Sequence, residues 1–259
     1  MALTLPRIYS PESLQTATTC ELGADNLRYL KTVLRLKPGD DLIIFDGFGH
    51  EFAARIQDFA AAGVNISLGA PIARTVEKIR LTLAQAIPKA GKMDGIVKTA
   101  AELGADVIIP FTAARSLGRI AGEKAEARVG RWRKIVREAA RCSRSPRLAV
   151  VEPISPFDDM LALAPPCACK MIFWEEEDRL TIRDALQDQR FSRVRHYFII
   201  VGPEGGLSRE EVARAEAAGF ASVSLGRRIL KVETAAAAII SIIQYEKGIF
   251  SESAKGGET

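Results

Sequence analysis

The sequence predicts an α/β protein in which a helix-covered parallel sheet follows a small β-rich domain. From residue 79 onward, short apolar runs alternate with amphipathic stretches, which is the pattern of repeated strand-helix units. Before residue 70, the apolar runs are instead separated by Pro-Gly and Asp-Gly turns. We therefore expect a first domain at residues 1–73 and a second domain at residues 74–250, with the boundary within residues 71–76.

The first domain is predicted to be a small antiparallel sheet or barrel. In residues 36–59, "LKPGDDLIIFDGFGHEFAARIQDF", the turn signals flank apolar runs that partly alternate. Residues 60–75, "AAAGVNISLGAPIART", then close this sheet and lead away from it.

The second domain is predicted to alternate strands and helices along its whole length. Strands are expected at residues 79–87, 106–111, 170–175, 196–202 and 221–225. Helices are expected at residues 92–103, around Trp132, and at residues 181–188, 209–218 and 233–247. Strands separated by helices pair in parallel through right-handed crossovers, which places helices on both faces of the sheet.

Local signals mark the ends of several elements. Gly104 ends the first helix of the second domain. Ser208 and Glu211 have the S-x-x-E spacing of a capping box, and Gly219 follows as the expected stop of that helix. Residues 251–259, "SESAKGGET", are small and polar, so we expect this tail to be disordered.

Composition excludes several classes of protein. No apolar run reaches the roughly 18 residues of a membrane span, and no signal peptide is recognisable, so we expect a soluble, cytoplasmic protein without a membrane partner. The four cysteines form no C-x-x-C pair, so we expect them to be reduced and mostly packed, with no metal site. Any zinc or Ser/Cys-His hydrolase would have to use His50 or His196, the only two histidines. We interpret His196 as a side chain at the start of a strand.

Positive charge is concentrated in the middle of the chain. Residues 74–147 contain 17 Lys and Arg against 7 Asp and Glu, although the whole chain has a net charge of only +4. Eight of these basic residues lie in "RVGRWRKIVREAARCSRSPR", along and beyond a predicted helix. A solvated helix face explains such a run, but its lack of balancing acids also indicates a phosphate-rich partner.

A glycine turn, "VGPEGGLS", follows the strand predicted at residues 196–202. A strand, a glycine-rich turn and a helix start are typical of a phosphate cradle. This turn lacks the Lys-Ser/Thr of a Walker A loop and the G-x-G-x-x-G spacing, and Glu204 would repel a phosphate while attracting a cation. Pro203, Gly205 and Gly206 indicate a tight backbone that a flat or bulky ligand can approach, with a simple strand-to-helix turn as the alternative.

A second unusual stretch, "SLGRRILKVETAAAAII", follows the strand predicted at residues 221–225. It places Arg227 and Arg228 in a loop beyond the strand, and Glu233 and Thr234 at the start of an alanine-rich helix. Open α/β sheets bind ligands at the carboxyl ends of their strands, so we expect this loop and the glycine turn to enclose a ligand together.

These two stretches, "VGPEGGLSREEVARAEAAGF" and "SLGRRILKVETAAAAI", resemble the carboxy-terminal signature of the RsmE family of ribosomal RNA small subunit methyltransferases, a family of the SPOUT class. "LTLAQAIPKAGKMDGIVKTAAELGADVIIPFTAARS" is similar to an earlier strand and helix of that family. "VLRLKPGDDLIIFDGFGHEFAARI" is similar to its amino-terminal domain. The resemblance covers most of residues 20–248.

The resemblance implies a SPOUT domain with a carboxy-terminal trefoil knot, preceded by a PUA-like barrel that helps to grip RNA. It also implies a homodimer, and S-adenosylmethionine as the cofactor. The residues that it assigns to the cofactor site are Phe173, Trp174, Gly202, Glu204, Gly205, Leu225, Gly226, Ile229, Leu230 and Thr234.

The reaction that the resemblance implies is methyl transfer to N3 of a uridine in the 16S rRNA of the 30S subunit. N3 must lose its proton before it attacks, and a nearby arginine favours the anion by about 1.4 kcal/mol for each unit by which the pKa falls. We assign this role to Arg228, with Glu204, Glu233 or water as the proton acceptor. N3 lies on the pairing edge, so the uridine must be unpaired or extruded. The residues assigned to RNA phosphates are Arg115, Arg141 and Arg144.

The chain departs from the family pattern at two places. Arg28 and Tyr29 stand where relatives commonly have two histidines, and Cys142 stands where they commonly have a glutamine. Two other functions stay open, namely methylation of a ribose 2′-oxygen by the same fold, and RNA binding without catalysis by a ribosome assembly factor.

Overall fold

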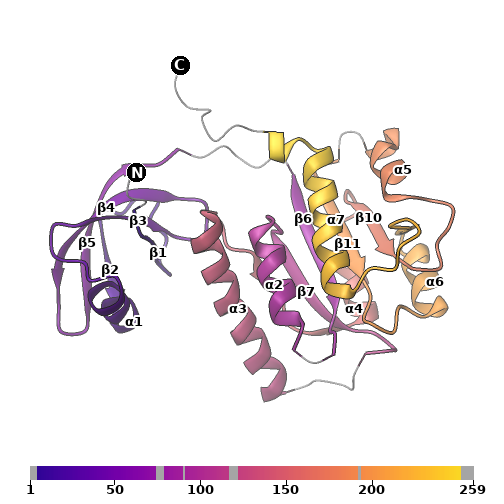
Figure 1. Ribbon diagram of the computed structural model, residues 1–259, viewed down its shortest axis with the longest axis horizontal. Helices are drawn as coiled ribbons and strands as arrows, with labels where there is room; N and C mark the ends of the chain where they lie inside the picture. Colours follow the sequence, from indigo (N-terminus) through magenta and orange to yellow (C-terminus); the bar gives the residue numbers. More distant parts are fainter. Residues whose placement is uncertain (1–4, 74–78, 90, 117–121, 192–193, 252–259) are drawn as a thin grey trace. The chain divides into compact units, whose positions relative to one another are not determined.

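The structure is a computed structural model that describes residues 5–73, 79–89, 91–116, 122–191 and 194–251. The chain divides into two compact units (Figure 1), the first within Met1–Thr75 and Arg137–Leu148 and the second within Val76–Val136 and Ala149–Thr259. Helix α3 (Glu123–Ser143) runs from the second unit into the first. The predicted tail beyond residue 251 and residues 74–76 of the predicted boundary lie outside the described residues.

The first unit contains a five-stranded sheet in the order β1-β3-β4-β5-β2. All neighbouring strands are antiparallel except β1 and β3, which are parallel. The strands are β1 (Arg7–Tyr9), β2 (Thr19–Gly23), β3 (Asp41–Phe45), β4 (Glu51–Phe59) and β5 (Gly63–Pro71). The largely antiparallel pairing confirms the small sheet predicted for this region.

Alternating strand residues form the core of the first unit. Leu42 and Ile44 of β3 and Val64 and Ile66 of β5 are fully buried, because every second side chain of a strand faces the same side. The helix α1 (Ala24–Arg28) and the π-helical turn η1 (Tyr29–Val33) follow β2 in the chain. The sequence pattern did not predict this helical segment.

The second unit contains a seven-stranded sheet in the order β12-β10-β11-β6-β7-β8, with β9 also paired to β7. Every strand pair in it is parallel. The strands are β6 (Arg80–Ala86), β7 (Val107–Thr112), β8 (Val150–Val151), β9 (Ser155–Pro156), β10 (Cys169–Phe173), β11 (His196–Val201) and β12 (Ala221–Val223). This pairing confirms the parallel sheet predicted from the alternation of strands and helices.

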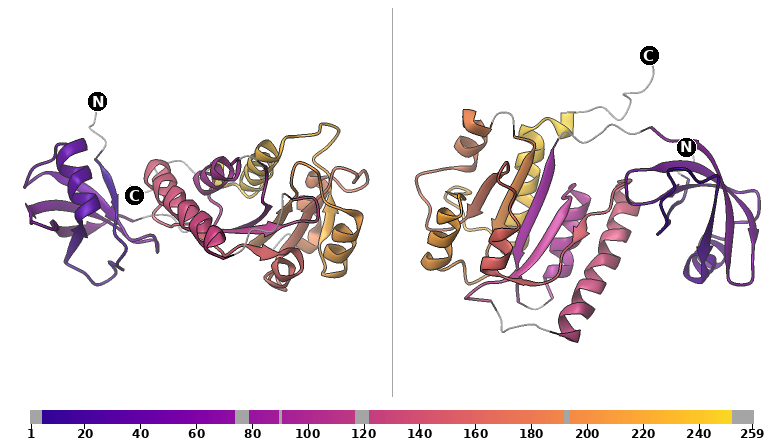
Figure 2. Two further views of the ribbon diagram at one scale, coloured as in Figure 1. Left: turned by 90° about the horizontal axis from the view of Figure 1, so that it is seen from below. Right: turned by 180° about the vertical axis from the view of Figure 1, so that it is seen from behind.

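Helices cover both faces of this sheet (Figures 1 and 2). Helices α2 (Met93–Glu102) and α7 (Val232–Glu246) lie side by side on one face, and α4 (Phe157–Ala162) and α6 (Arg209–Ala217) lie on the other. The remaining elements are α5 (Ile182–Gln187) and the 3-10 turns η2 (Gln189–Phe191) and η3 (Ile249–Ser251). Within the described part of the chain, no helix combines the length and the apolar character needed to cross a lipid bilayer.

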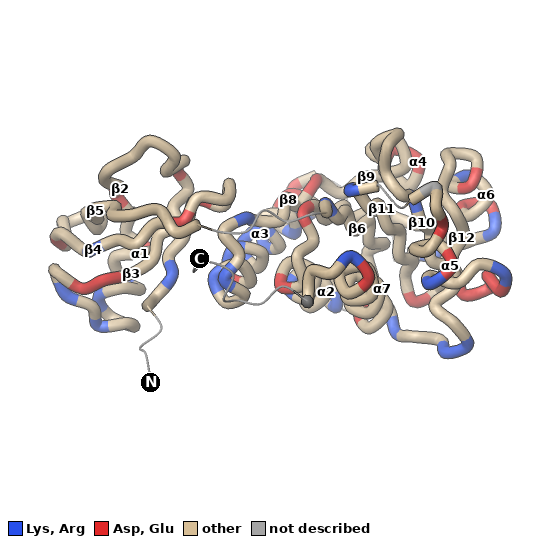
Figure 3. Tube along the Cα trace, turned by 90° about the horizontal axis from the view of Figure 1, so that it is seen from above, with Lys and Arg blue, Asp and Glu red and all other residues tan. Residues whose placement is uncertain are grey.

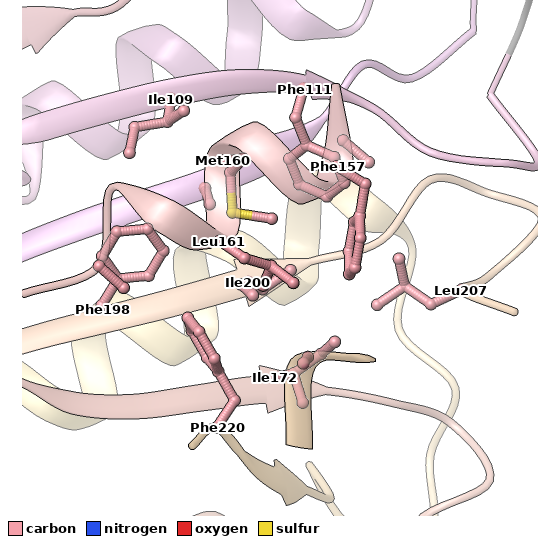
Figure 4. Close-up of a cluster of buried hydrophobic side chains, with 14 of the residues drawn as sticks. Ile109, Phe111, Phe157, Met160, Leu161, Ile172, Phe198, Ile200, Leu207 and Phe220 are labelled. Carbon is pink, nitrogen blue, oxygen red and sulfur yellow. The ribbon is translucent and has the colours of Figure 1, made fainter. Parts of the chain in front are cut away.

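The two faces of the sheet are buried by alternate residues of its strands. Phe198 and Ile200 of β11 belong to a buried cluster with Phe157 and Met160 of α4 (Figure 4). Tyr197 points to the opposite face, where the ammonium of Lys247, directly after α7, lies 5.5 Å from its ring centre. Burial on both faces explains why the strand sequences read as continuous apolar runs.

The predicted helix ends are confirmed. The Ser208 side chain accepts a hydrogen bond from the Glu211 backbone N–H, and Glu211 accepts one from the Ser208 backbone, which is a complete capping box. Gly104 and Gly219 follow α2 and α6 with φ of +85°, a conformation that glycine adopts without strain. Thr181 forms a second capping box at the start of α5.

The cysteines and His196 have structural surroundings. All four cysteines are free, but only Cys20 and Cys169 are buried, so the expectation that most of them are packed was wrong. Burial raises the pKa of Cys20 to about 11 and that of Cys169 to about 12, which makes both thiols unreactive. His196 is the first residue of β11, as predicted, and its Nε2 lies 2.9 Å from the Thr82 hydroxyl. Burial lowers the pKa of His196.

Candidate functional site

The carboxyl ends of the central strands form one row across the sheet of the second unit. Phe173 of β10 is the register partner of both Val223 of β12 and Val201 of β11. Val201 is in turn paired with Gln85 of β6. The segments that follow these residues therefore leave the sheet at the same edge. Their described residues are 87–89 with 91–92, 174–181, 202–208 and 224–231.

The connections after the neighbouring strands β6 and β11 diverge. The chain continues from β6 to α2 on one face of the sheet, whereas residues 202–208 lead from β11 to α6 on the other face (Figure 2). Neighbouring strands whose connections diverge form a topological switch point, which is where open α/β sheets bind ligands. The predicted glycine turn therefore lies where a ligand site is expected from topology alone.

Glu204 ties this glycine turn to the segment after β6. Its two carboxylate oxygens accept hydrogen bonds from the Lys89 backbone N–H at 3.2 and 3.0 Å. The Lys92 ammonium lies 3.1 Å from the same carboxylate. Burial alone would raise the pKa of Glu204, but the hydrogen bonds from Lys89 and Lys92 outweigh burial and hold the pKa below its usual value. Glu204 is therefore ionised at neutral pH.

Lys92 also faces a second carboxylate. Its Nζ lies 3.6 Å from Glu233 Oε2, in the first turn of α7. The hydrogen bond to Glu204, and then the charge of Glu233, raise the pKa of Lys92. One ammonium between two carboxylates leaves these three side chains together with a net negative charge, which suits a cationic group beside them better than a phosphate. The sequence analysis named both glutamates but missed Lys92, whose only signal is its place directly before α2.

The glycines after Glu204 leave no room for larger residues. A Cβ atom on Gly205 would lie 3.2 Å from Cβ of Arg115, and Arg115 Nη1 donates a hydrogen bond to the Gly205 carbonyl at 2.9 Å. Gly206 has φ of +71°, and a Cβ atom there would overlap the Glu175 carboxylate. The tight backbone predicted for this turn is confirmed, and the space beside it is filled by the protein's own side chains.

The loop after β12 is presented to solvent. Arg227 and Arg228 are exposed, and Ile229 is 89 % exposed. Gly226 has φ of +93°, and its backbone N–H donates to the Ser224 hydroxyl at 3.2 Å. Among the described residues, neither Arg227 nor Arg228 finds a hydrogen-bond or ion-pair partner. Both guanidinium groups are therefore available to a ligand or substrate.

Gln85 and Trp174, at this edge, each have a buried polar atom without a hydrogen-bond partner among the described residues. Gln85 is fully buried and donates to the Ala86 carbonyl at 2.9 Å, but its Oε1 accepts no hydrogen bond. The indole Nε1 of Trp174, directly after β10, is buried without an acceptor. Buried polar groups are nearly always paired, so these atoms indicate a polar ligand or water.

The structure brings most of the predicted site residues to this one edge. Phe173 is buried at the end of β10, and Leu225 and Leu230 are half-buried at the two ends of the loop after β12. Thr234 is exposed in the first turn of α7. The two other predicted site residues, Arg141 and Arg144, belong to the first unit.

Arg141 is held by its neighbours in the first unit. Its guanidinium forms an ion pair with Glu138, donates to the Tyr29 hydroxyl at 2.9 Å and lies 5.4 Å from the Tyr29 ring centre. Cys142 Sγ lies 4.0 Å from the same guanidinium. The two departures from the family pattern, at Tyr29 and Cys142, therefore meet at one arginine. Arg144 is exposed, with φ of +60°.

Helix α3 carries the basic run that the sequence analysis identified, and Figure 3 shows Lys and Arg repeating along it. Part of this charge is balanced. Arg131 forms an ion pair with Asp94 of α2, and the indole of Trp132 donates to the same carboxylate at 3.1 Å. Arg133 donates to the Val151 carbonyl at 3.0 and 3.2 Å. The run is therefore in part a structural face of the second unit.

Comparison with known proteins agrees with this fold. Residues 75–244 match the model of the RNA methyltransferase domain, and residues 22–59 match that of the RNA methyltransferase PUA domain. These two matches identify an RNA methyltransferase with a PUA-like amino-terminal domain. Full-length relatives narrow this class further.

Ribosomal RNA small subunit methyltransferase E from Rickettsia conorii is 31 % identical over 242 residues, which cover 92 % of this chain and 94 % of the relative. The enzyme of the same name from Bacillus subtilis is 28 % identical, covering 91 % and 93 %. The crystal structure of the Neisseria gonorrhoeae enzyme bound to S-adenosylmethionine superposes with a TM-score of 0.82 at 31 % identity, covering 93 % of this chain and 97 % of that one. The chain belongs to the ribosomal RNA small subunit methyltransferase E family, as its sequence motifs predicted. The trefoil knot stays a prediction.

Proposed function

We propose that the chain transfers a methyl group from S-adenosylmethionine to N3 of a uridine in 16S rRNA. The observation that carries this proposal is the ionised Glu204, which joins two loops at the switch point of an RNA methyltransferase domain. S-adenosylmethionine supplies a methyl group on a positively charged sulfur. The net negative charge of Glu204, Glu233 and Lys92 together favours such a cation, whereas it would repel the phosphates of a nucleotide.

The residues proposed to hold the cofactor lie in the segments at the carboxyl edge, at the ends of β6 and β10, and in the first turn of α7. Glu204 supplies negative charge, and Ile229 and Leu230 supply apolar surface. The unpartnered polar atoms of Gln85 and Trp174 fit a ligand that carries its own donors and acceptors. The other proposed cofactor residues, which offer backbone groups or small side chains, are Phe173, Gly202, Gly205, Leu225, Gly226 and Thr234.

Arg228 is proposed to stabilise the deprotonated uracil. It is exposed, and no partner among the described residues neutralises its charge. A guanidinium near N3 lowers the pKa of that nitrogen, and each unit is worth about 1.4 kcal/mol. The lowered pKa of Glu204 makes it a poor proton acceptor, so Glu233 or water is the better candidate and the part of Glu204 in the reaction is electrostatic.

The remaining assignments concern RNA and assembly. Residues 1–73 are proposed as the domain that grips RNA, with residues 74–250 as the catalytic domain. Arg115, Arg141 and Arg144 are proposed to contact phosphates of a uridine-containing segment within the 30S particle. We propose that the protein is cytoplasmic. We also propose a homodimer, because Ile242 and Tyr245 expose 38 % and 70 % of their surface on α7.

The test is methylation of 30S particles that lack the modification, followed by mass spectrometry of the nucleosides. Wild type is expected to produce 3-methyluridine, and Arg228→Ala to lower turnover about 100-fold, the typical effect of removing a group that stabilises developing negative charge. Arg227→Ala, at the neighbouring exposed arginine, is the matched control and should keep most of the turnover. A 2′-O-methylated product, or equal turnover in Arg228→Ala, would contradict the proposal.

A further inference from the structure

The first unit exposes an aromatic side chain on a loop whose backbone makes many hydrogen bonds. Residues 46–50, "DGFGH", connect β3 to β4, and Phe48 at the centre of this loop is 62 % exposed. A single exposed phenylalanine is common on protein surfaces and needs no explanation by itself. Phe48 differs because hydrogen bonds fix the backbone on both sides of it.

The buried Asp46 side chain holds the loop by hydrogen bonds. It is 1 % exposed, and its carboxylate accepts hydrogen bonds from the backbone N–H groups of Phe48 at 2.8 Å, His50 at 3.1 Å and Leu14 at 3.2 Å. His50 Nδ1 lies 2.6 Å from the same carboxylate. Phe48 is therefore exposed on a loop whose backbone is held in place by hydrogen bonds.

A distant segment fixes the other side of the loop. The Leu148 backbone N–H donates to the Gly47 carbonyl at 2.9 Å, and the Gly49 N–H donates to the Pro146 carbonyl at 3.2 Å. Phe48 and Arg147 face each other as a β-bridge. A Cβ atom on Gly49 would lie 3.2 Å from Arg147 Nε, so the Arg147 side chain lies directly over that glycine. The aromatic ring and the guanidinium are therefore presented on adjacent positions.

The charges around Phe48 favour a polyanion. Arg147 is exposed, and no acidic partner of its side chain is found among the described residues. The acid of the loop, Asp46, is buried and saturated with donors. A partner protein that covered Phe48 would have to neutralise Arg147, whereas a nucleic acid strand supplies a base for the ring and a phosphate for the guanidinium group.

We propose that Phe48 stacks on an unpaired base of the substrate RNA while Arg147 binds the adjacent phosphate, so that the first unit contains a subsite for single-stranded RNA. The subsite rests on the proposed function only in requiring an RNA substrate. A duplex hides the faces of its bases within the stack, so the subsite selects unpaired segments. This selection matches a reaction that needs an unpaired uridine.

The experiment uses the full-length chain and two RNA probes, a single-stranded oligouridylate of ten nucleotides and an RNA duplex of the same length. Phe48→Trp should show tryptophan fluorescence that the single strand quenches, beyond the change seen in wild type, whose tryptophans are Trp132 and Trp174. Phe48→Ala should weaken single-strand binding about tenfold. Phe48→Tyr should retain binding. The control Val33→Ala, at a side chain that is 63 % exposed in the same unit, should have no effect.

Arg147→Gln should reduce the dependence of single-strand affinity on salt, whereas the exposed control Lys37→Gln should not. Equal single-strand binding by Phe48→Ala and wild type, unquenched Phe48→Trp, or equal affinity for the duplex would each overturn the subsite. Affinity for S-adenosylmethionine, measured by calorimetry on the same variants, should be unchanged. Failure of wild type to bind the cofactor would contradict the proposed function. The effect of Phe48→Ala on RNA binding would still show whether the subsite exists.

Discussion

A carboxylate follows a strand inside a glycine-containing loop in each unit, and the two carboxylates act differently. Asp46 is buried and accepts hydrogen bonds from Phe48 and His50 of its own loop. The Glu204 side chain is 24 % exposed and accepts from Lys89, which lies 115 residues earlier in the chain. The first carboxylate fixes one loop, and the second joins two. The partners of such a carboxylate, and not its presence in a glycine loop, therefore indicate its role.

Replacing Asp46 should have the largest effect on stability. Asp46→Asn is expected to lower the free energy of unfolding by about 2 kcal/mol, because hydrogen bonds to a charged acceptor are worth about 1.5–3 kcal/mol. Urea denaturation at pH 7 measures this loss, with the exposed Asp25→Asn as the control. Affinity for S-adenosylmethionine should not change.

The contribution of Asp46 should depend on pH in a defined direction. Burial alone would raise its pKa, but hydrogen bonds from His50 and from the backbone hold the pKa below the usual 3.8. Its stabilisation is therefore fully present above pH 3.8 and is lost as the pH falls below that value, through the folded-state pKa. The difference between Asp46→Asn and wild type should shrink in acid. A difference that is constant down to pH 2 would show that charge is not its source.

Replacing Glu204 should affect the cofactor more than the fold. Glu204→Ala is expected to raise the Kd for S-adenosylmethionine about tenfold, equivalent to about 1.4 kcal/mol, because it removes negative charge and releases the Lys89 loop. Calorimetry provides the measurement, and Glu210→Ala, at the exposed start of α6, is the control. An unchanged Kd would mean that the turn does not serve the cofactor.

Replacing Lys92 should have the smallest effect, which sharpens the assignment of Glu204. Lys92→Met is expected to change cofactor affinity about threefold, the scale of a partly exposed ion pair. Because Lys92 helps to hold the pKa of Glu204 below its usual 4.5, cofactor affinity should begin to fall at a higher pH in Lys92→Met than in wild type. Lys98→Met, on the outer face of α2, is the control. Identical pH profiles of cofactor affinity in Lys92→Met and wild type would show that Lys92 does not control the protonation of Glu204.

The sequence predicted the parts of this molecule that depend on local chemistry. The capping box at Ser208, the stop at Gly219 and the parallel strands follow from residue spacing and apolar runs, and the structure has all of them. The signature stretches also predicted the family. The parallel pairing of β1 with β3 was not predictable, because nothing local in either strand encodes its distant partner.

The contacts that hold the site together were also not predictable, because they join segments that are distant in the sequence. Lys89 and Lys92 follow β6, whereas Glu204 follows β11, and only the strand order brings these segments together. Tyr29 and Cys142 looked like separate departures from the family pattern, yet both contact Arg141. A pair of substitutions that meet in space is recognisable only once the fold is known.

The most direct test of the account is hydrogen exchange with and without S-adenosylmethionine, resolved by peptide. The cofactor is expected to protect amides in residues 87–92, 202–208 and 224–231, which follow strands of the second sheet at its carboxyl edge, and to leave residues 46–50 unchanged. Protection confined to the loop at residues 46–50, or no protection in the three segments despite saturating cofactor, would contradict it.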